Sequence, residues 1–508
     1  MKRLLILILF SLFFLNLSGQ NNVTITGKVN YNFPDKYILS EHVFLSYLKN
    51  FCSLTPDNKI LVYSSKDTVT DSFSISCFIP YSTPADLQID KYGMRIFIEP
   101  GDNLHLVLDL SEKDYQGHFT GKGAERNNYL VNQYFNKGKS FNPFKQIRKD
   151  YKKMTLPYFY IYCDSVYKVW NYYLDTLSRE LKQSDFYDYA INEVEYEIGC
   201  EQYSFLKSHF KERMLAGEQL GPDSTYYWFL YDNKSKSISG VNDGIFNTIK
   251  NDLVVKTNNQ KATNCGWYFR FLDNYLNDLM PEYNADPHFK IPNLENLYIH
   301  QYRIAKNQFT NKVKDAMLGR ILISAFSAQE ENYKAMDSLI NDYQSTKPDT
   351  SCLNTVLTKY KDYQKLIKGA SAPDFSFTNQ RGNKKSLSDF KGKVVYIVAF
   401  SSFNIPSLNE MNSLSSLQEH FANKNVALIY ISFDSSKKEW EKNVNQFKIE
   451  GEQYLIGVTN KANEFSNLYN IKNFPQCILI DKEGKIVSIN AHRPSQGVEG
   501  DIEDLLNK

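Results

Sequence analysis

Closely spaced cysteines are missing from the sequence. Seven cysteines are scattered over 508 residues, and no Cys-x-x-Cys occurs anywhere. This absence excludes the usual dithiol motif of disulfide exchange. An odd count leaves at least one thiol unpaired, and the sequence does not assign disulfide connectivity. Cys77 continues the alternating apolar row of Phe73, Ile75 and Ile79, so we expect it to be a buried free thiol.

Other signatures of catalysis and binding are also missing. The eight histidines form no ligand spacing with Cys, Asp or Glu, so the sequence predicts no metal site and no cofactor. It contains no Gly-x-Ser-x-Gly elbow and no glycine loop for phosphate. The formal net charge is +2, and no basic block with interleaved aromatics occurs. Nucleic acid is therefore not an expected partner.

Long apolar runs are confined to the N-terminus. Lys2 and Arg3 precede a mostly apolar run over residues 4–17, which is unbroken as far as Phe10, and small residues follow it. This pattern predicts a secretory signal peptide at 1–20. An uncleaved anchor is the weaker alternative, because the run is shorter than the roughly 18–20 residues that span a bilayer. We expect an exported protein of the periplasm or cell envelope, with no membrane span after signal removal.

Short alternating segments follow the predicted signal peptide. Apolar and polar side chains alternate over residues 23–29, and further strand-like segments lie at 59–64, 72–79, 87–89, 94–98 and 104–110. Repeated short strands with turns between them predict a β-rich, sandwich-like domain at 21–122. The segments Thr26–Val29, Ile98–Asn103 and Phe119–Glu125 resemble marks of a small β-domain of unknown function that precedes TlpA-like modules in exported bacterial proteins.

The hydrophobic period changes to 3.6 from about Ala124, which predicts a helical region at 123–368. One apolar stripe includes Phe159, Cys163 and Trp170, and we expect such stripes to be core rather than the lining of a ligand groove. Helix breaks are expected near 217–222, 232–239, 284–287 and 347–349. Thr350 or Ser351 is expected to cap the last helix.

The last region, 369–508, has an α/β pattern. Predicted strands lie at 394–400, 426–433, 454–458, 476–480 and 486–490, and predicted helices at 407–421, 438–447, 460–469 and 502–506. Its opening segments, Ala372–Phe375 and Leu387–Lys393, resemble those of TlpA-like and peroxiredoxin-related thioredoxin domains of the AhpC/TSA–redoxin superfamily. The predicted fold is multidomain α+β, with an N-terminal β-sandwich-like domain, a central all-α region and a C-terminal α/β thioredoxin fold.

Residues 398–411 combine a strand end, a polar turn and a helix start. They resemble the active-site segment of TlpA-like and ResA-like proteins, whose pattern runs Phe-Trp-Ala-Ser-Trp-Cys-x-x-Cys-x-x-Glu-Met. On that pattern Asn404 and Ser407 stand where the two cysteines are expected. A hydroxyl and a carboxamide provide neither a thiolate nor a disulfide. Val398 replaces the buried Asp of many thioredoxins, and Phe403 replaces the usual Trp.

The resemblance also implies a groove beside this turn, facing a cis peptide bond before Pro475. The expected groove residues are Phe403, Asn404, Ile405, Pro406, Ser407, Phe474 and Pro475. Free N–H groups at the helix start could receive an anion or a peptide carbonyl there. Cys477 follows two residues after Pro475, and strand alternation places it in the sheet core as an inert thiol.

Three hypotheses remain open at this point. The preferred one is an exported, redox-inactive thioredoxin-like protein that binds an extended peptide or envelope protein in the groove and has no catalytic residues. The enzyme alternative is thiol-disulfide oxidoreductase or peroxiredoxin-like activity in redox homeostasis through a cysteine outside the motif. In the third, the β-domain and the helices carry the function and the thioredoxin module is a scaffold.

Overall fold

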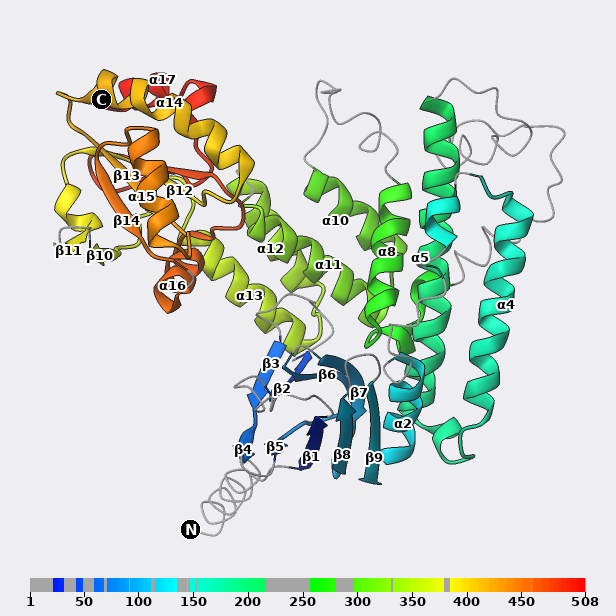
Figure 1. The fold of residues 1–508 in the computed structure, drawn as a ribbon. Helices are drawn as coiled ribbons and strands as arrows, with labels where there is room; N and C mark the ends of the chain where they lie inside the picture. Colours follow the sequence, from blue (N-terminus) through cyan, green and yellow to red (C-terminus); the bar gives the residue numbers. More distant parts are fainter. Residues whose placement is uncertain are drawn as a thin grey trace, which may run out of the picture. The chain divides into compact units, whose positions relative to one another are not determined.

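A computed structural model gives the structure of the chain (Figure 1). It divides into two compact units, residues 1–321 with 347–352 and residues 322–346 with 353–508. The predicted signal peptide, the first three predicted helix breaks and Cys52 lie outside the described residues. The structure describes residues 22–31, 43–48, 59–67, 71–90, 92–110, 115–134, 144, 147–151, 153–215, 256–279, 297–329, 332–378, 384–457 and 459–507.

Within the described residues of the N-terminal part, nine strands form two sheets. One sheet has the order β4-β5-β1-β8-β9 and the other β3-β2-β6-β7. A single core cluster draws its apolar residues from both sheets, as expected for a sandwich-like domain. The strands are β1 (Val23–Tyr31), β2 (Val43–Leu48), β3 (Lys59–Tyr63), β4 (Ser65–Asp67), β5 (Ser72–Cys77), β6 (Thr83–Ile89), β7 (Tyr92–Ile98), β8 (Asn103–Leu110) and β9 (Tyr115–Lys122).

Strands β2 and β9 were not predicted, for different reasons. Three consecutive residues of β2 are buried, so its apolar pattern does not alternate. In β9 the buried positions are Gly117 and Phe119, and glycine gives little hydrophobic signal. The alternating row that ends near Cys77 is buried, and Cys77 is a free thiol, which confirms that prediction.

Helices follow from Ala124. Phe159, Cys163 and Trp170 of the predicted stripe are at most 3% exposed and belong to the core, whereas Tyr173 and Leu181 further along the same stripe are only partly buried. The predicted cap of the last helix was wrong, because Asp349 accepts hydrogen bonds from the N–H groups of Ser351 and Cys352. The helices are α2 (Ala124–Tyr134), α4 (Leu156–Asp175), α5 (Asp185–Leu215), α8 (Gly266–Asp278), α10 (Leu297–Gln308), α11 (Asn311–Ser327), α12 (Tyr333–Ser345) and α13 (Thr350–Gln364).

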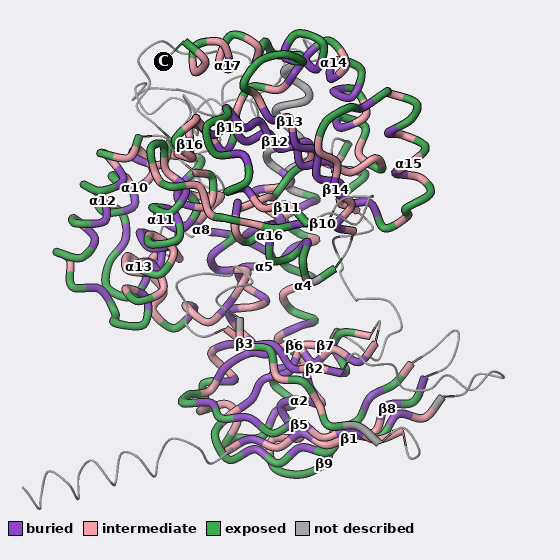
Figure 2. Tube along the Cα trace, turned by 90° about the vertical axis from the view of Figure 1, so that its left-hand side faces the viewer, coloured by how far each residue is buried: buried purple, intermediate pink, exposed green. Residues whose placement is uncertain are grey.

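A five-stranded mixed sheet organises the C-terminal α/β domain, with the order β14-β13-β12-β15-β16. Strand β12 (Val394–Phe400) is buried along its whole length and lies at the centre of this sheet (Figure 2). It pairs in parallel with β13 (Val426–Ser432) and antiparallel with β15 (Gln476–Ile480). The outer strands are β14 (Glu452–Leu455) and β16 (Ile486–Ser488), and β10 (Ser376–Thr378) and β11 (Lys384–Ser386) form a separate hairpin.

Side chains of β12 alternate between two apolar clusters, one on each face of the sheet. This two-sided burial explains why its sequence is apolar throughout instead of alternating. The helices of the domain are α14 (Ile405–Phe421), α15 (Lys437–Gln446), α16 (Asn460–Tyr469) and α17 (Val498–Leu506). Across the described part of the chain, no helix has the length and apolar character needed to cross a membrane.

Candidate functional site

The turn between β12 and α14 is closed by its own side chains. Asn404 is the N-cap of α14, and its Oδ1 accepts hydrogen bonds from the Ser407 N–H at 3.0 Å and the Ser407 hydroxyl at 3.2 Å. The Asn404 N–H donates to the Ser401 carbonyl at 3.1 Å, and Pro406 has no N–H. Of the four positions 404–407, whose N–H groups have no acceptor within a helix, only Ile405 therefore retains an N–H for which no acceptor is found among the described residues, so the expectation of several free N–H groups was wrong.

A buried carboxylate holds the other side of the turn. Asp434 is 1% exposed and accepts hydrogen bonds from the Ser401 hydroxyl at 3.0 Å and the Ser402 N–H at 2.7 Å. Its second oxygen accepts from the Ser432 hydroxyl at 2.9 Å. Hydrogen bonds to a carboxylate are stronger than neutral ones, so this residue fixes where the turn leaves β12.

Sequence reasoning missed Asp434, although a signal was present. Ser432 is the last residue of β13 and Asp434 lies two residues further on, while Ser401 follows β12, the parallel neighbour of β13. The carboxyl ends of parallel strands meet at one edge of a sheet, so polar residues after both strands are expected to lie close together.

Two large apolar side chains of the turn face solvent. Phe403 is 70% exposed and Ile405 is 72% exposed, whereas Ser407 is only 1% exposed. Pro406 is exposed as well. Of the predicted groove residues in this turn, three are therefore exposed, Asn404 is partly buried, and the Ser407 side chain is buried.

The segment before β15 lies next to the end of β12. Ala399 of β12 is paired with Gln476, so the two residues before Gln476 flank the point where β12 enters the turn. The Phe474–Pro475 peptide bond is cis, which confirms the prediction. Pro475 is buried, and the Phe474 ring lies 4.8 Å from that of Phe433, centroid to centroid.

Cys477 belongs to the core, as predicted. It is 2% exposed within the cluster that contains Tyr396, and burial raises the pKa of its thiol to about 11. A thiol with a raised pKa supplies little thiolate at neutral pH. The other described free cysteines, Cys77, Cys163, Cys200 and Cys265, are buried too, and Cys352 is disulfide-bonded.

Glu410 ties the start of α14 to the segment before α17. It is 7% exposed, and its carboxylate accepts hydrogen bonds from the Ser495 N–H at 3.0 Å and the Ser495 hydroxyl at 2.7 Å. The carboxylate is thus already satisfied by protein donors. Among the described residues no group of three or more His, Cys, Asp or Glu side chains is placed to hold a metal ion.

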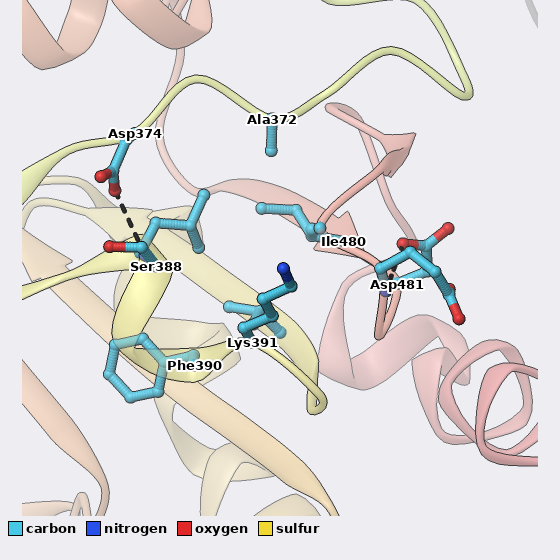
Figure 3. A pocket seen from close by; sticks show the side chains of 11 residues that line it. Ala372, Asp374, Ser388, Phe390, Lys391, Ile480 and Asp481 are labelled. Carbon is cyan, nitrogen blue, oxygen red and sulfur yellow. Dashed lines mark hydrogen bonds between the residues drawn. The ribbon is translucent and has the colours of Figure 1, made fainter.

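A small pocket of about 230 Å³ opens at the opposite end of β12 from the turn (Figure 3). Val395 near the start of β12 and Ile480 at the end of β15 contribute to its apolar lining. Asp374 lies at its edge and accepts a hydrogen bond from the Ser388 N–H at 3.2 Å. The residues of the predicted groove do not line this pocket.

Comparisons with known proteins match the C-terminal part of the chain. Residues 367–506 match the Redoxin family. The thiol-disulfide oxidoreductase ResA of Bacillus thuringiensis is 27% identical over 147 residues, which are 29% of this chain and 83% of that protein. The thioredoxin-like protein YneN of Bacillus subtilis is 30% identical over 135 residues, 26% of this chain and 78% of YneN.

Solved structures match over the same share of the chain. The thioredoxin domain of a thiol-disulfide oxidoreductase from Bacteroides vulgatus is 28% identical, covers 28% of this chain and 99% of its own, and has a TM-score of 0.26. A thiol-disulfide oxidoreductase from Bacteroides fragilis is 27% identical, covers 27% of this chain and 99% of its own, and has a TM-score of 0.24.

Proposed function

The chain belongs to the redoxin family of thioredoxin-like thiol-disulfide oxidoreductases through its C-terminal domain, and we propose that this member binds polypeptide without redox turnover. Asn404 and Ser407 take the places of the two redox cysteines. The protein is exported and acts in the periplasm or cell envelope. Its partner is an extended peptide segment, free or part of an envelope protein, that lies between the turn and Phe474–Pro475.

The observation that carries the proposal is the capping role of Asn404. In a redox-active domain the helix start lowers the pKa of the attacking thiol, because its N–H groups and dipole favour the thiolate. Here the Asn404 carboxamide accepts the hydrogen bond from Ser407 that would otherwise favour an anion. At the position where a redox-active domain has an activated cysteine, this turn therefore has an asparagine that caps the helix.

Exposed apolar surface supports binding at this place. Phe403 and Ile405 flank Asn404 and are both more than two-thirds exposed. Burying each against a partner contributes roughly 1.5–3 kcal/mol before the costs of association. The Asp434 hydrogen bonds keep the turn in one conformation, so a partner would meet a preorganised surface.

Export is proposed from the N-terminal sequence. A short basic start, a mostly apolar run over residues 4–17 and small residues after it form the pattern of a signal peptide. The enzyme alternative has less support, because the pKa of the Cys477 thiol is raised and the described free cysteines are buried. A partner would have to open the fold to reach any of them.

Fluorescence anisotropy with residues 21–508 and a labelled, reduced and S-carboxymethylated insulin B chain tests the proposal. This probe is an extended peptide that cannot exchange disulfides. We expect saturable binding that weakens about 10-fold or more in the double variant Phe403→Asp with Ile405→Asp.

Leu61→Asp is the matched control, because Leu61 is also an exposed apolar residue, 51% exposed, but lies in β3. Binding that Leu61→Asp weakens as much as the double variant, or binding that the double variant leaves intact, would contradict the proposed site. Absence of any binding would favour the scaffold hypothesis instead.

A further inference from the structure

Helix α4 carries apolar side chains on two different faces. One face belongs to the core, where the Phe159 ring stacks on Phe205 of α5 with the ring centroids 4.0 Å apart (Figure 1). The second face is equally free of charge but is open to solvent, although the outer face of a surface helix is ordinarily polar. This exposed face of α4 consists of Ser165 and four large apolar residues that are 47–68% exposed, Tyr158, Ile161, Val169 and Tyr172.

The exposed face of α4 is symmetric in sequence about Ser165. A tyrosine stands seven residues away on either side, Tyr158 and Tyr172. A β-branched aliphatic residue stands four residues away on either side, Ile161 and Val169. At 3.6 residues per turn all of them lie within about 40° of the direction of Ser165. The face therefore presents the same order of side chains in both directions along the helix, which makes it complementary to an antiparallel copy of itself.

A two-fold axis through Ser165 would bring matching groups of two copies together. In such an isologous contact Tyr158 lies beside Tyr172 of the second copy, and Tyr172 beside Tyr158. Ile161 meets Val169 in the same way. Ser165, at the crossing point, has a small side chain that lets the helices approach closely. Its hydroxyl already donates to the Ile161 carbonyl of its own helix at 2.8 Å, so its burial leaves no donor without a partner.

Charges beside the exposed face fit the same arrangement. Asp164 and Lys168 lie on one side of it and form an ion pair at 2.6 Å within the helix. The two-fold axis keeps this side of both copies together. Each Asp164 then lies only about 3 Å along the helix axis from Lys168 of the second copy. The flanking charges of two antiparallel copies are therefore complementary, which favours this register more than it adds to affinity.

The size of the exposed face is sufficient for a weak dimer. Its four large apolar side chains offer roughly 400–500 Å² per copy, because a tyrosine can bury 150–250 Å² and these side chains are about half to two-thirds exposed. Two copies would bury about 1,000 Å² together with the flanking charges, which is the lower end for specific interfaces. A dimer that dissociates on dilution follows from this area.

We propose that two copies of this chain dimerise through the exposed face of α4, in antiparallel orientation with Ser165 on the two-fold axis. The interface lies outside the redoxin domain, and the proposal does not depend on the function proposed for that domain.

Sedimentation equilibrium of residues 21–508 over a hundredfold range of concentration tests the association. We expect a monomer–dimer equilibrium with a Kd on the order of 10 µM. The double variant Ile161→Asp with Val169→Asp should weaken dimerisation at least 10-fold, because it brings carboxylates of both copies together. Both positions are exposed, so the circular dichroism spectrum should remain that of the wild type.

Leu61→Asp is the matched control, because Leu61 is also an exposed apolar residue but lies in β3. It should leave the Kd unchanged. The proposal is overturned if the wild type is monomeric at every concentration, if the double variant dimerises as tightly as the wild type, or if Leu61→Asp weakens the dimer as much.

Disulfide crosslinking tests the antiparallel register. Ser165→Cys places the two thiols together at the axis, so mild oxidation should give a covalent dimer on a non-reducing gel. Asp175→Cys is the control, because Asp175 is exposed on the same helix but ten residues from the axis, which puts its two copies about 30 Å apart. Crosslinking of Ser165→Cys that is no faster than that of Asp175→Cys would contradict the proposed geometry.

Discussion

Strand β12 and the turn that follows it differ in how closely they keep the pattern of a redox protein. The strand is buried on both faces, pairs with β13 and β15, and lies beside a cis Phe474–Pro475 bond. The turn contains a carboxamide and a hydroxyl where the resemblance places thiols. Burial and strand pairing maintain the sheet of this domain, whereas the side chains at 404 and 407 cap the following helix and offer no thiol for disulfide chemistry.

The largest effect on this difference between strand and turn is expected when cysteines are placed at positions 404 and 407. The double variant Asn404→Cys with Ser407→Cys should form an oxidisable pair and reduce insulin disulfides roughly 10-fold or more faster than the wild type, because a thiol at a helix start has a lowered pKa. Either single variant serves as control, since one thiol cannot resolve the mixed disulfide. A double variant that is folded but never oxidises would show that the two positions are not equivalent to the cysteines.

Removal of Asp434 should have the next largest effect. Asp434→Ala leaves the Ser401 and Ser432 hydroxyls and the Ser402 N–H without their acceptor, at a cost of roughly 2–4 kcal/mol in local stability. Hydrogen exchange of the β12 and β13 amides measures this loss. Asp434→Asn retains one acceptor and should lose less; equal exchange in both variants and the wild type would show that Asp434 does not hold the turn.

The Asn404 cap accounts for a smaller effect. Asn404→Ala should destabilise the start of α14 by about 1 kcal/mol, whereas Asn404→Asp should keep the cap, because a carboxylate accepts the Ser407 N–H equally well. Hydrogen exchange over residues 405–411 distinguishes the two variants. Identical protection in Asn404→Ala and the wild type would remove the structural reason for asparagine at this position.

The smallest effect concerns the Cys477 thiol. Its folded pKa is about 11 against an ordinary 9.0, so the neutral thiol is favoured in the fold. The stability that this group contributes is fully present below pH 9 and is lost as the pH rises toward 11, because the unfolded thiol ionises first. Alkylation with iodoacetamide at pH 8, followed by peptide mapping, should leave Cys477 unmodified unless the protein is unfolded. Rapid native labelling would revive the enzyme alternative.

The sequence predicted the C-terminal domain well because its strands are strongly apolar. The predicted bounds of α16 and β15 are those observed, since capping residues or turns mark both ends. The apolar run that predicted β12 is long and uninterrupted, and Cys477 follows directly from strand alternation. Hydrophobic periodicity alone predicts the type and approximate bounds of a strand or helix wherever a defined face of it is buried.

Polar contacts between distant segments were the part of the fold that the sequence predicted least. Polar residues at the ends of two apolar strands gave a signal for Asp434, but its hydrogen bonds depend on the parallel pairing of β12 with β13, which the local pattern does not specify. Asp349 instead of Thr350 caps α13, and residue preference could not decide between them because Asp, Thr and Ser are all favoured at helix N-caps. The same limit applies to Asn404. The sequence shows that an asparagine replaces the expected cysteine, but the hydrogen bond that it accepts from the Ser407 N–H was found only in the structure.

Insulin-disulfide reduction by the wild-type protein, residues 21–508, tests the central claim most directly. With dithiothreitol as reductant, we predict turbidity that develops at the rate of the uncatalysed reaction, because the turn has no thiol and the pKa of the Cys477 thiol is raised. Turnover at a rate comparable to that of an active thioredoxin would contradict the account, since a cysteine outside the turn would then be carrying out disulfide exchange.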